Sequence, residues 1–233
     1  MRCNLSFCCW VLAGVSLQAN ELGCLTNPLA SRVTKFEAKG ISRLQALLQL
    51  GYESQACLGI EALDQELRAA SVELSLVNAT VEEIIRKILT PASHLRVREQ
   101  GKVVNIFRAG DTRTWLDVVM PNFAAPTAPR QALSNLLFMT FSLQNDPSIR
   151  TFAGSYPADQ DNSIGPFKES QRSVREILGM LVSAGSAGAW IANSAAVQSK
   201  EVPKLPFWTI LDYSTGREML MSISAGINAE SQR

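Results

Sequence analysis

One stretch of the chain, residues 71–89, changes its hydrophobic period from two to about 3.6, and this change constrains the fold more than any other feature. Apolar and polar residues alternate over residues 72–76, which predicts an extended strand with one apolar face. Apolar residues then recur at helical spacing over residues 81–88. Thr80 followed by Glu83 fits a capping box. The sequence therefore predicts a strand, a tight turn and a short amphipathic helix that packs back on the strand.

The first half of the chain places further elements on both sides of this stretch. Residues 33–36 and 56–60 are predicted strands, and Ser42 and Gly51 are predicted to begin and end a helix between them. Residues 94–107 alternate on both sides of a Gln-Gly turn, which predicts a hairpin. The predicted order is strand, helix, strand, strand, helix and hairpin.

These residues resemble the secretin and TonB N-terminal short domain. The resemblance rests on the run Val-Glu-Leu-Ser-Leu-Val-Asn-Ala-Thr-Val-Glu-Glu-Ile-Ile over residues 72–85, on Phe36 ahead of the leucine-rich helix, and on the hairpin at residues 97–106. It covers about residues 33–108. The resemblance implies a compact α+β periplasmic module used for contacts within secretion or uptake assemblies. It implies no catalytic residues.

A similar order of elements is predicted in the second half. The helix at residues 131–143 repeats the leucine spacing of the first helix, and Ser173 followed by Glu176 repeats the capping box ahead of another amphipathic helix. Residues 190–191 and 206–213 are predicted strands. We interpret residues 115–213 as a divergent second copy of the first unit; chance matching of two amphipathic helices is the alternative.

The expected fold class is therefore α+β, with two tandem small units, each of mixed short strands with two helices packed on a sheet. The predicted organisation is a signal peptide at 1–19, a linker at 20–32, a first unit at 33–110, a second unit at 111–213 and a frayed polar tail at 214–233.

The N-terminus has the features of an export signal. Arg2 supplies a positive charge, residues 5–17 form an uncharged apolar run, and Ala19 offers a small residue for cleavage. The run is shorter than the roughly 20 residues of a membrane span. A lipoprotein signal at Cys24 and a buried N-terminal helix are the alternatives. We expect a periplasmic or secreted protein with no transmembrane span after cleavage. Association of this exported protein with the outer membrane is a further form of the same hypothesis.

Cleavage after Ala19 would leave Cys24 and Cys57 as the only cysteines. In an oxidising compartment this pair can form one disulfide. Two unpaired thiols, with Cys57 acting as a small apolar strand residue, are the alternative. The sequence leaves both open.

The composition argues against a nucleic-acid partner and against several kinds of chemistry. Of 233 residues only 18% are charged, and the net charge of +1 gives no basic excess for nucleic-acid phosphates, so we expect no nucleic-acid partner. His94 is the single histidine, which rules out a metal site built on a histidine pair. No glycine-rich phosphate loop occurs, and we expect no cofactor.

An exported hydrolase is the alternative function. Its candidate residues are Ser186, in a segment that superficially resembles a nucleophile elbow, and the pair Asp159 and Asp161. A helix is predicted before Ser186 and a strand after it, the reverse of the elbow, so a helix C-cap loop fits better. We therefore expect a protein without enzymatic activity.

The candidate partner-binding residues are aromatic. Phe123, Phe207 and Trp208 follow prolines or a long loop and can border an open sheet edge that accepts a partner strand; burial in the core is the alternative. The leading hypothesis is a non-enzymatic protein–protein interaction module of the bacterial envelope. A ligand-binding protein is a further alternative, with a cleft between the two units lined by Trp115, Trp190 or Trp208.

Overall fold

The computed structural model describes residues 23–61, 67–68, 70–90, 94–110, 115–145, 163–192 and 208–230. Residues 145 and 226–230 are described by their backbone alone. The expected signal peptide lies outside the described residues, as do Phe207, Asp159 and Asp161.

A mixed sheet of five strands forms the centre of the molecule. Its order is β11 (Trp208–Asp212), β10 (Gly188–Ala192), β2 (Cys57–Ile60), β5 (Val103–Arg108) and β4 (Leu95–Gln100). The strand β2 runs parallel to both β10 and β5, whereas β4 and β11 are antiparallel to their neighbours. The two outer pairs are hairpin partners from opposite halves of the chain, and β2 joins them.

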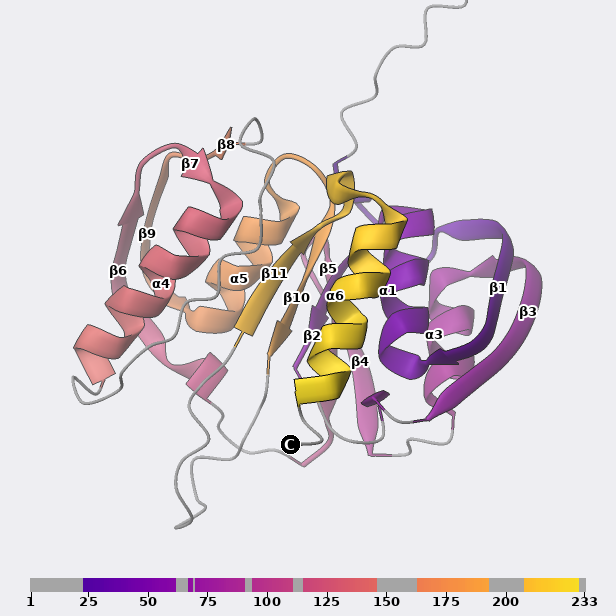
Figure 1. The fold of residues 1–233 in the computed structure, drawn as a ribbon. Helices are drawn as coiled ribbons and strands as arrows, with labels where there is room; N and C mark the ends of the chain where they lie inside the picture. The colour runs from indigo at the N-terminus through magenta and orange to yellow at the C-terminus, as the bar shows by residue number, and fades with distance from the viewer. Residues whose placement is uncertain are drawn as a thin grey trace, which may run out of the picture.

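Helices and two-stranded ribbons cover both faces of this sheet (Figure 1). The first half supplies the ribbon β1 (Arg32–Ser42) and β3 (Ser71–Thr80) with the helices α1 (Arg43–Ser54) and α3 (Val81–Leu89). The second half supplies the ribbon β6 (Val119–Ala125) and β9 (Phe167–Ser173) with α4 (Arg130–Asn145) and α5 (Val174–Ser183). Short elements complete the fold: η1 (Trp115–Asp117), β7 (Ala128–Pro129), β8 (Ser163–Ile164) and η2 (Tyr213–Thr215).

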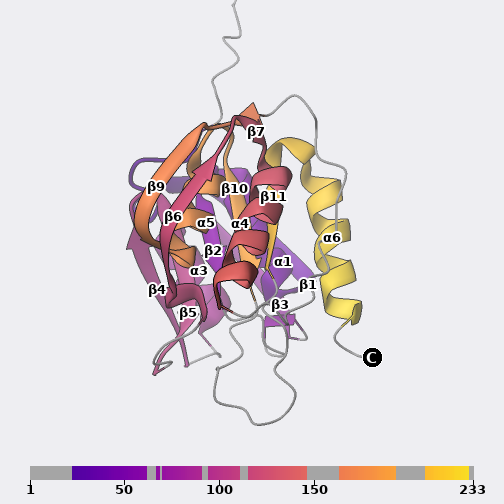
Figure 2. The ribbon, with the colours of Figure 1, turned by 90° about the vertical axis from the view of Figure 1, so that its left-hand side faces the viewer.

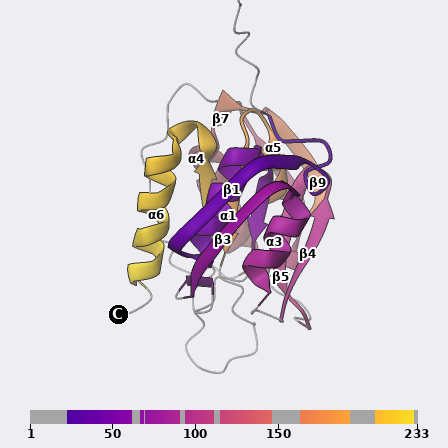
Figure 3. The same cartoon turned by 90° about the vertical axis from the view of Figure 1, so that its right-hand side faces the viewer.

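The layers follow one another as ribbon, helices, sheet, helices, ribbon. In Figure 2 the ribbon β6–β9 lies in front of α5, and in Figure 3 the ribbon β1–β3 lies in front of α1. The helix α5 packs on β10, β2 and β11, while α1 packs on β10 and β2 from the opposite side. Because both faces are covered, every residue of β2 and β10 is buried. This explains why neither strand shows the polar alternation of a half-exposed sheet.

Three of the described helices begin with a complete capping box, as their local sequences favour. The predicted box at the start of α3 is confirmed: the Thr80 N–H donates to Glu83 Oε2 at 2.8 Å, and the Glu83 N–H donates to Thr80 Oγ1 at 3.2 Å. The predicted box of Ser173 and Glu176 at α5 is also confirmed. At α1 the same reciprocal bonds join Ser42 to Gln45.

Two boundary predictions are wrong. Gly51 lies inside α1, which continues to Ser54; a Cβ at position 51 would clash with the Tyr213 hydroxyl, so close packing against η2 explains this glycine. The C-terminal segment is no frayed tail, because residues 217–230 form the helix α6 (Arg217–Glu230), which packs on α1 and buries Leu220. The polar residues at the end of the chain suggested a tail, although Leu220, Ile223 and Ile227 recur at helical spacing and could have indicated α6.

The mixed α+β class is confirmed, with several small sheets around the central one. The two expected units share this central sheet, because β2 of the first half pairs with β10 of the second. Their origin by duplication stays a prediction.

Candidate functional site

A disulfide joins Cys24 to Cys57, with the two Cα atoms 5.5 Å apart. Both cysteines are buried, and the Gly188 N–H donates to Cys57 Sγ at 3.4 Å. The Val182 carbonyl oxygen lies 3.3 Å from the same sulfur. The bond therefore ties the segment before β1 to the centre of the shared sheet, next to the end of α5. Of the two alternatives left open by the sequence, this structure contains the disulfide.

Ser186 belongs to a polar network at the beginning of β10. Its hydroxyl donates to the Asp212 carboxylate at 2.9 and 3.0 Å, and Asp212 also forms an ion pair with Arg130. The Arg130 guanidinium is buried and donates to the carbonyl oxygens of Leu181 at 2.8 Å and Ala184 at 2.7 Å. Burial lowers the pKa of Arg130, while the negative charge of Asp212 opposes this shift.

This network closes the end of α5. Arg130 satisfies carbonyl groups that lose their intrahelical partners where α5 ends. Asp212 in turn accepts from the Ser214 N–H at 2.9 Å and begins η2. Helix α5 precedes Ser186 and β10 follows it, so a strand–serine–helix elbow is not present at this position.

His94 lies far from Ser186. Ser186 precedes β10, at the end of the sheet where β10, β2 and β5 begin, whereas β4 is antiparallel to β5 and His94 precedes it at the opposite end. The separation spans three strand spacings of about 4.8 Å and about eight residues of about 3.3 Å, or roughly 30 Å. A direct Ser186–His94 pair, which a hydrolase built on Ser186 would need, is therefore excluded by the sheet register.

A second buried ion-pair network joins the two halves of the chain. Arg175 on α5 makes a bidentate pair with Glu61, at 2.6 and 2.8 Å, and also pairs with Asp117 in η1. The side chains of Arg175 and Glu61 are only 11% and 4% exposed. Burial alone would lower the pKa of Arg175, but the hydrogen bonds and charges of Glu61 and Asp117 outweigh it and raise this pKa above its ordinary value. The guanidinium is thus fixed as a cation that links β2 to α5.

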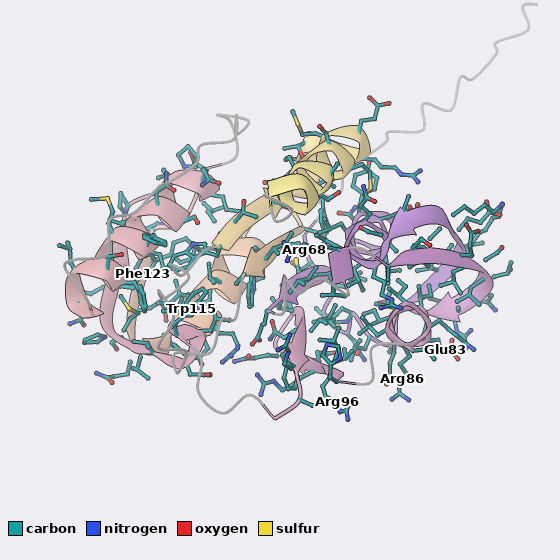
Figure 4. The ribbon with its side chains drawn as sticks, turned by 60° about the horizontal axis from the view of Figure 1, so that its bottom comes forward. Arg68, Glu83, Arg86, Arg96, Trp115 and Phe123 are labelled. Carbon is teal, nitrogen blue, oxygen red and sulfur yellow. A yellow bond between two sulfur atoms is a disulfide. The ribbon has the colours of Figure 1, made fainter. Side chains whose placement is uncertain are left out.

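The aromatic residues expected at a partner surface are buried. Phe123 is 2% exposed and Trp208 is 7% exposed, so a partner could reach neither without opening the core. Trp208 packs on Trp115 with ring centroids 5.1 Å apart and donates from Nε1 to Ser134 Oγ at 3.0 Å. Figure 4 shows Phe123 and Trp115 inside the part of the molecule that contains β6 and α4. The partner-binding role predicted for Phe123 and Trp208 is therefore corrected to a packing role.

The tryptophans fill space instead of lining a ligand cleft. Trp115 and Trp208 stack on each other, and Trp190 is fully buried over Gly59, where a Cβ would clash with the indole ring. A cleft does lie elsewhere among the described residues, between α5 and the turn that joins β4 to β5. Its volume is about 250 Å³. Lys102 and Asn105 line one side, and Gly179 lines the other.

The outer face of α4 carries the most continuous exposed apolar surface among the described elements. Leu143 is 72% exposed and Met139 is 57% exposed, and half-buried Leu136 precedes them on the same side at spacings of three and four residues. After Arg130, the helix contains no charged residue. We refer to Leu136, Met139 and Leu143 as the α4 stripe.

The described ranges contain neither a candidate metal site nor a helix suited to cross a membrane. No group of three or more histidine, cysteine, aspartate or glutamate side chains is arranged to hold a metal ion. No helix in this part of the chain is both long and apolar enough to cross a membrane.

No family model, curated protein or solved structure matches the chain.

Sequence reasoning missed the two arginines that organise the interior. Arg130 is the one charged residue of a 16-residue helix, and such isolation is a usable signal for a buried cation. Asn105 was also missed, although it interrupts the apolar run Val-Val-Asn-Ile-Phe in a strand that is buried at that point. Glu61 offered no comparable signal, because an acidic residue after a short strand is typical of an exposed turn.

Proposed function

We propose that the protein is a non-enzymatic protein–protein interaction module of the bacterial cell envelope. The α4 stripe is the observation that carries this proposal. Single exposed apolar side chains are common on protein surfaces. Contiguous exposed apolar side chains at helical spacing are instead typical of helices that bind another protein. Met139 and Leu143 are one helical turn apart and both point away from the core.

The buried charges support a role in contact rather than in chemistry. Ser186 and Asp212 belong to the network that ends α5, and Glu61 and Asp117 neutralise Arg175. These groups bond to one another and to backbone carbonyl groups at the end of α5, which supports a structural role for them. An exported hydrolase is the alternative function, and it would need a catalytic set that uses residues other than these.

The location in the envelope is supported by the disulfide and by the resemblance of residues 33–108 to the secretin and TonB N-terminal short domain. A buried disulfide in a bacterial protein fits an oxidising compartment such as the periplasm. The apolar N-terminal run fits export. The partner on this proposal is a component of a secretion or uptake assembly.

The proposal is tested by capturing partners of the full chain, carrying an affinity tag, from its native cells after mild crosslinking. We expect one or a few specific partners with the wild-type chain, and their loss when the stripe is made acidic by Met139→Glu together with Leu143→Glu. The control is Val77→Glu, compared with Met139→Glu alone, because Val77→Glu places the same single charge on an exposed apolar residue of β3, 73% exposed and in the other half of the chain. A wild-type chain that stays monomeric and retains no partner would contradict the proposal.

A further inference from the structure

The strand β4 lies at one end of the central sheet, and among the described strands it pairs with β5 alone. Figures 2 and 3, which view the molecule from opposite sides, both show β4 at its margin. An edge strand presents a row of unpaired backbone groups along its outer side. Such a row is a template on which a further strand can form.

The register of the β4–β5 hairpin shows which backbone groups these are. The Ala109 N–H donates to the His94 carbonyl oxygen at 2.7 Å, and bonded pairs alternate with non-bonded pairs along an antiparallel ladder. The N–H and C=O groups of Val97 and Glu99 are therefore directed away from β5. Within the described part of the chain, these groups bond to no other element. They are the open part of the edge.

The second half of the chain shows what the corresponding strand holds. Strand β10 follows α5 as β4 follows α3, and each is the first strand of a hairpin. The two helices also begin alike: the Val81 N–H donates to the Ser31 carbonyl oxygen at 2.9 Å, and the Val174 N–H donates to the Val118 carbonyl oxygen at 3.1 Å. The outer side of β10 is paired with β2, which runs parallel to it. By the same placement, the outer side of β4 suits a parallel strand.

The side chains of β4 restrict which strand would fit. Arg96 and Arg98 are exposed on one face of the hairpin, and Lys102 is exposed in its turn. Arg98 lies 5.1 Å from the centroid of the Phe107 ring, a contact that leaves its charge in place. Glu99 is the one acidic residue of the strand. Pairing of β4 with β4 of a second copy would bring the arginines together, so an acidic strand fits this edge better than a second copy does.

We propose that the outer edge of β4 binds an extended acidic segment of another protein, which joins the central sheet as a parallel strand. Acidic and apolar residues alternate in this segment, so that acidic side chains lie beside Arg98 on one face and apolar ones beside half-buried Val97 on the other. Its backbone bonds to the open groups of Val97 and Glu99. The inference does not depend on the proposed contact through the α4 stripe, because β4 and the α4 stripe share no residue.

Binding is tested by titrating the folded full chain with synthetic peptides and following its amide NMR signals. The probe is acetyl-Thr-Glu-Val-Glu-Val-Glu-Val-Thr-amide, and the matched peptide carries lysine in place of every glutamate. We expect the acidic peptide to shift the signals of Val97 and Glu99 and to bind at least about tenfold more tightly than the lysine peptide. A nitroxide at the N-terminus of the acidic peptide is expected to broaden the signal of Leu95 more than that of Gly101, as a parallel arrangement requires.

Two further peptides test whether binding occurs by strand addition. One is N-methylated at its glutamates and the other at its valines, so each lacks the N–H groups on one side of the extended backbone. We expect one of the two peptides to lose binding and the other to retain it, because only one set of N–H groups faces β4. This comparison needs no change in the protein.

Three variants assign the interactions. Val97→Pro removes an N–H on the open side without breaking a bond to β5, so it is expected to abolish binding and to preserve the fold. Arg98→Gln is expected to weaken the acidic peptide about tenfold. Lys87→Gln, which removes an exposed cation on α3, is the matched control and is expected to change nothing.

The proposal is overturned if the acidic peptide leaves the β4 signals unchanged at millimolar concentration, or if the lysine peptide binds as tightly. It is also overturned if both N-methylated peptides bind equally, or if the nitroxide broadens Gly101 instead of Leu95. The double variant Met139→Glu and Leu143→Glu is expected to bind the acidic peptide as the wild type does, which separates this edge from the α4 stripe.

Discussion

At the scale of single residues, the interior of this protein is organised by two arginines. Arg130 and Arg175 are both largely removed from water, and each is paired with acidic groups from another element. A buried ion pair adds little net stability compared with an apolar pair of the same shape, but removing one partner leaves the other charge buried and unpaired. These two arginines therefore contribute more to the specificity of packing between elements than to the stability of the fold.

Arg175→Met is expected to destabilise the fold by roughly 3–5 kcal/mol, because it leaves the Glu61 carboxylate buried without a cation. The measurement is urea unfolding followed by tryptophan fluorescence. The comparison is Asp117→Asn, because Asp117 pairs with the same arginine but its side chain is 39% exposed. This substitution is expected to change the free energy of unfolding by about 1 kcal/mol or less. Equal effects of the two variants would contradict the view that burial of Glu61 dominates.

At the scale of elements, the sequence predicts those features that depend on contacts between residues close together in the chain. The capping boxes of α3 and α5 were predictable because Thr80 and Ser173 need only a glutamate three residues later. The pairing of β2 with β10 was not predictable, because it depends on residues far apart in the sequence and on a strand that is apolar on both faces.

The candidate sites follow the same rule. The number of cysteines left after the expected cleavage made the disulfide one of two open alternatives, whereas the burial of Phe123 and Trp208 depends on α4 and η1 covering them. Asn105 and Gly179 form one cleft only because α5 of the second half lies against a hairpin of the first. No local pattern contains that information.

The capping box of α5 makes the stability of the fold depend on pH. The Ser173 N–H, then the Ser173 hydroxyl and Arg172, lower the pKa of Glu176 below its ordinary value of 4.5. Because the folded pKa is below the unfolded one, the stabilisation is fully present above about pH 4.5 and is lost as the pH falls through the folded value. We expect Glu176→Gln to be less stable than the wild type at pH 7, by at most about 1 kcal/mol, and equally stable at pH 2. A difference that persists at pH 2 in urea unfolding would refute this reading.

At the scale of the whole molecule, the chain is built around one shared sheet. Strand β2 pairs with β10 on one side and β5 on the other, and the disulfide attaches the segment before β1 to Cys57 in the same strand. The contacts that hold the halves together are therefore central and buried. We expect the described core to unfold in a single transition, because neither half retains a covered sheet without the other.

The disulfide is expected to contribute to this transition. Its loss should lower the free energy of unfolding by about 2–4 kcal/mol, since the bond closes a loop with a sequence separation of 33 residues. The measurement is urea unfolding of the chain lacking residues 1–19, with and without a thiol reductant. Cys24→Ala removes the bond, so its unfolding midpoint should not respond to reductant. An identical midpoint for the wild-type chain in both conditions would show that the bond is absent in solution.

The central claim is that this molecule works by contact through the α4 stripe. Its most direct test replaces Met139 with a photo-crosslinking amino acid in cells that produce the full chain, and does the same at exposed Val77 on β3. The account predicts a covalent adduct with one defined envelope protein from position 139 and none from position 77. The absence of any adduct from position 139, or the same adducts from both positions, would contradict it.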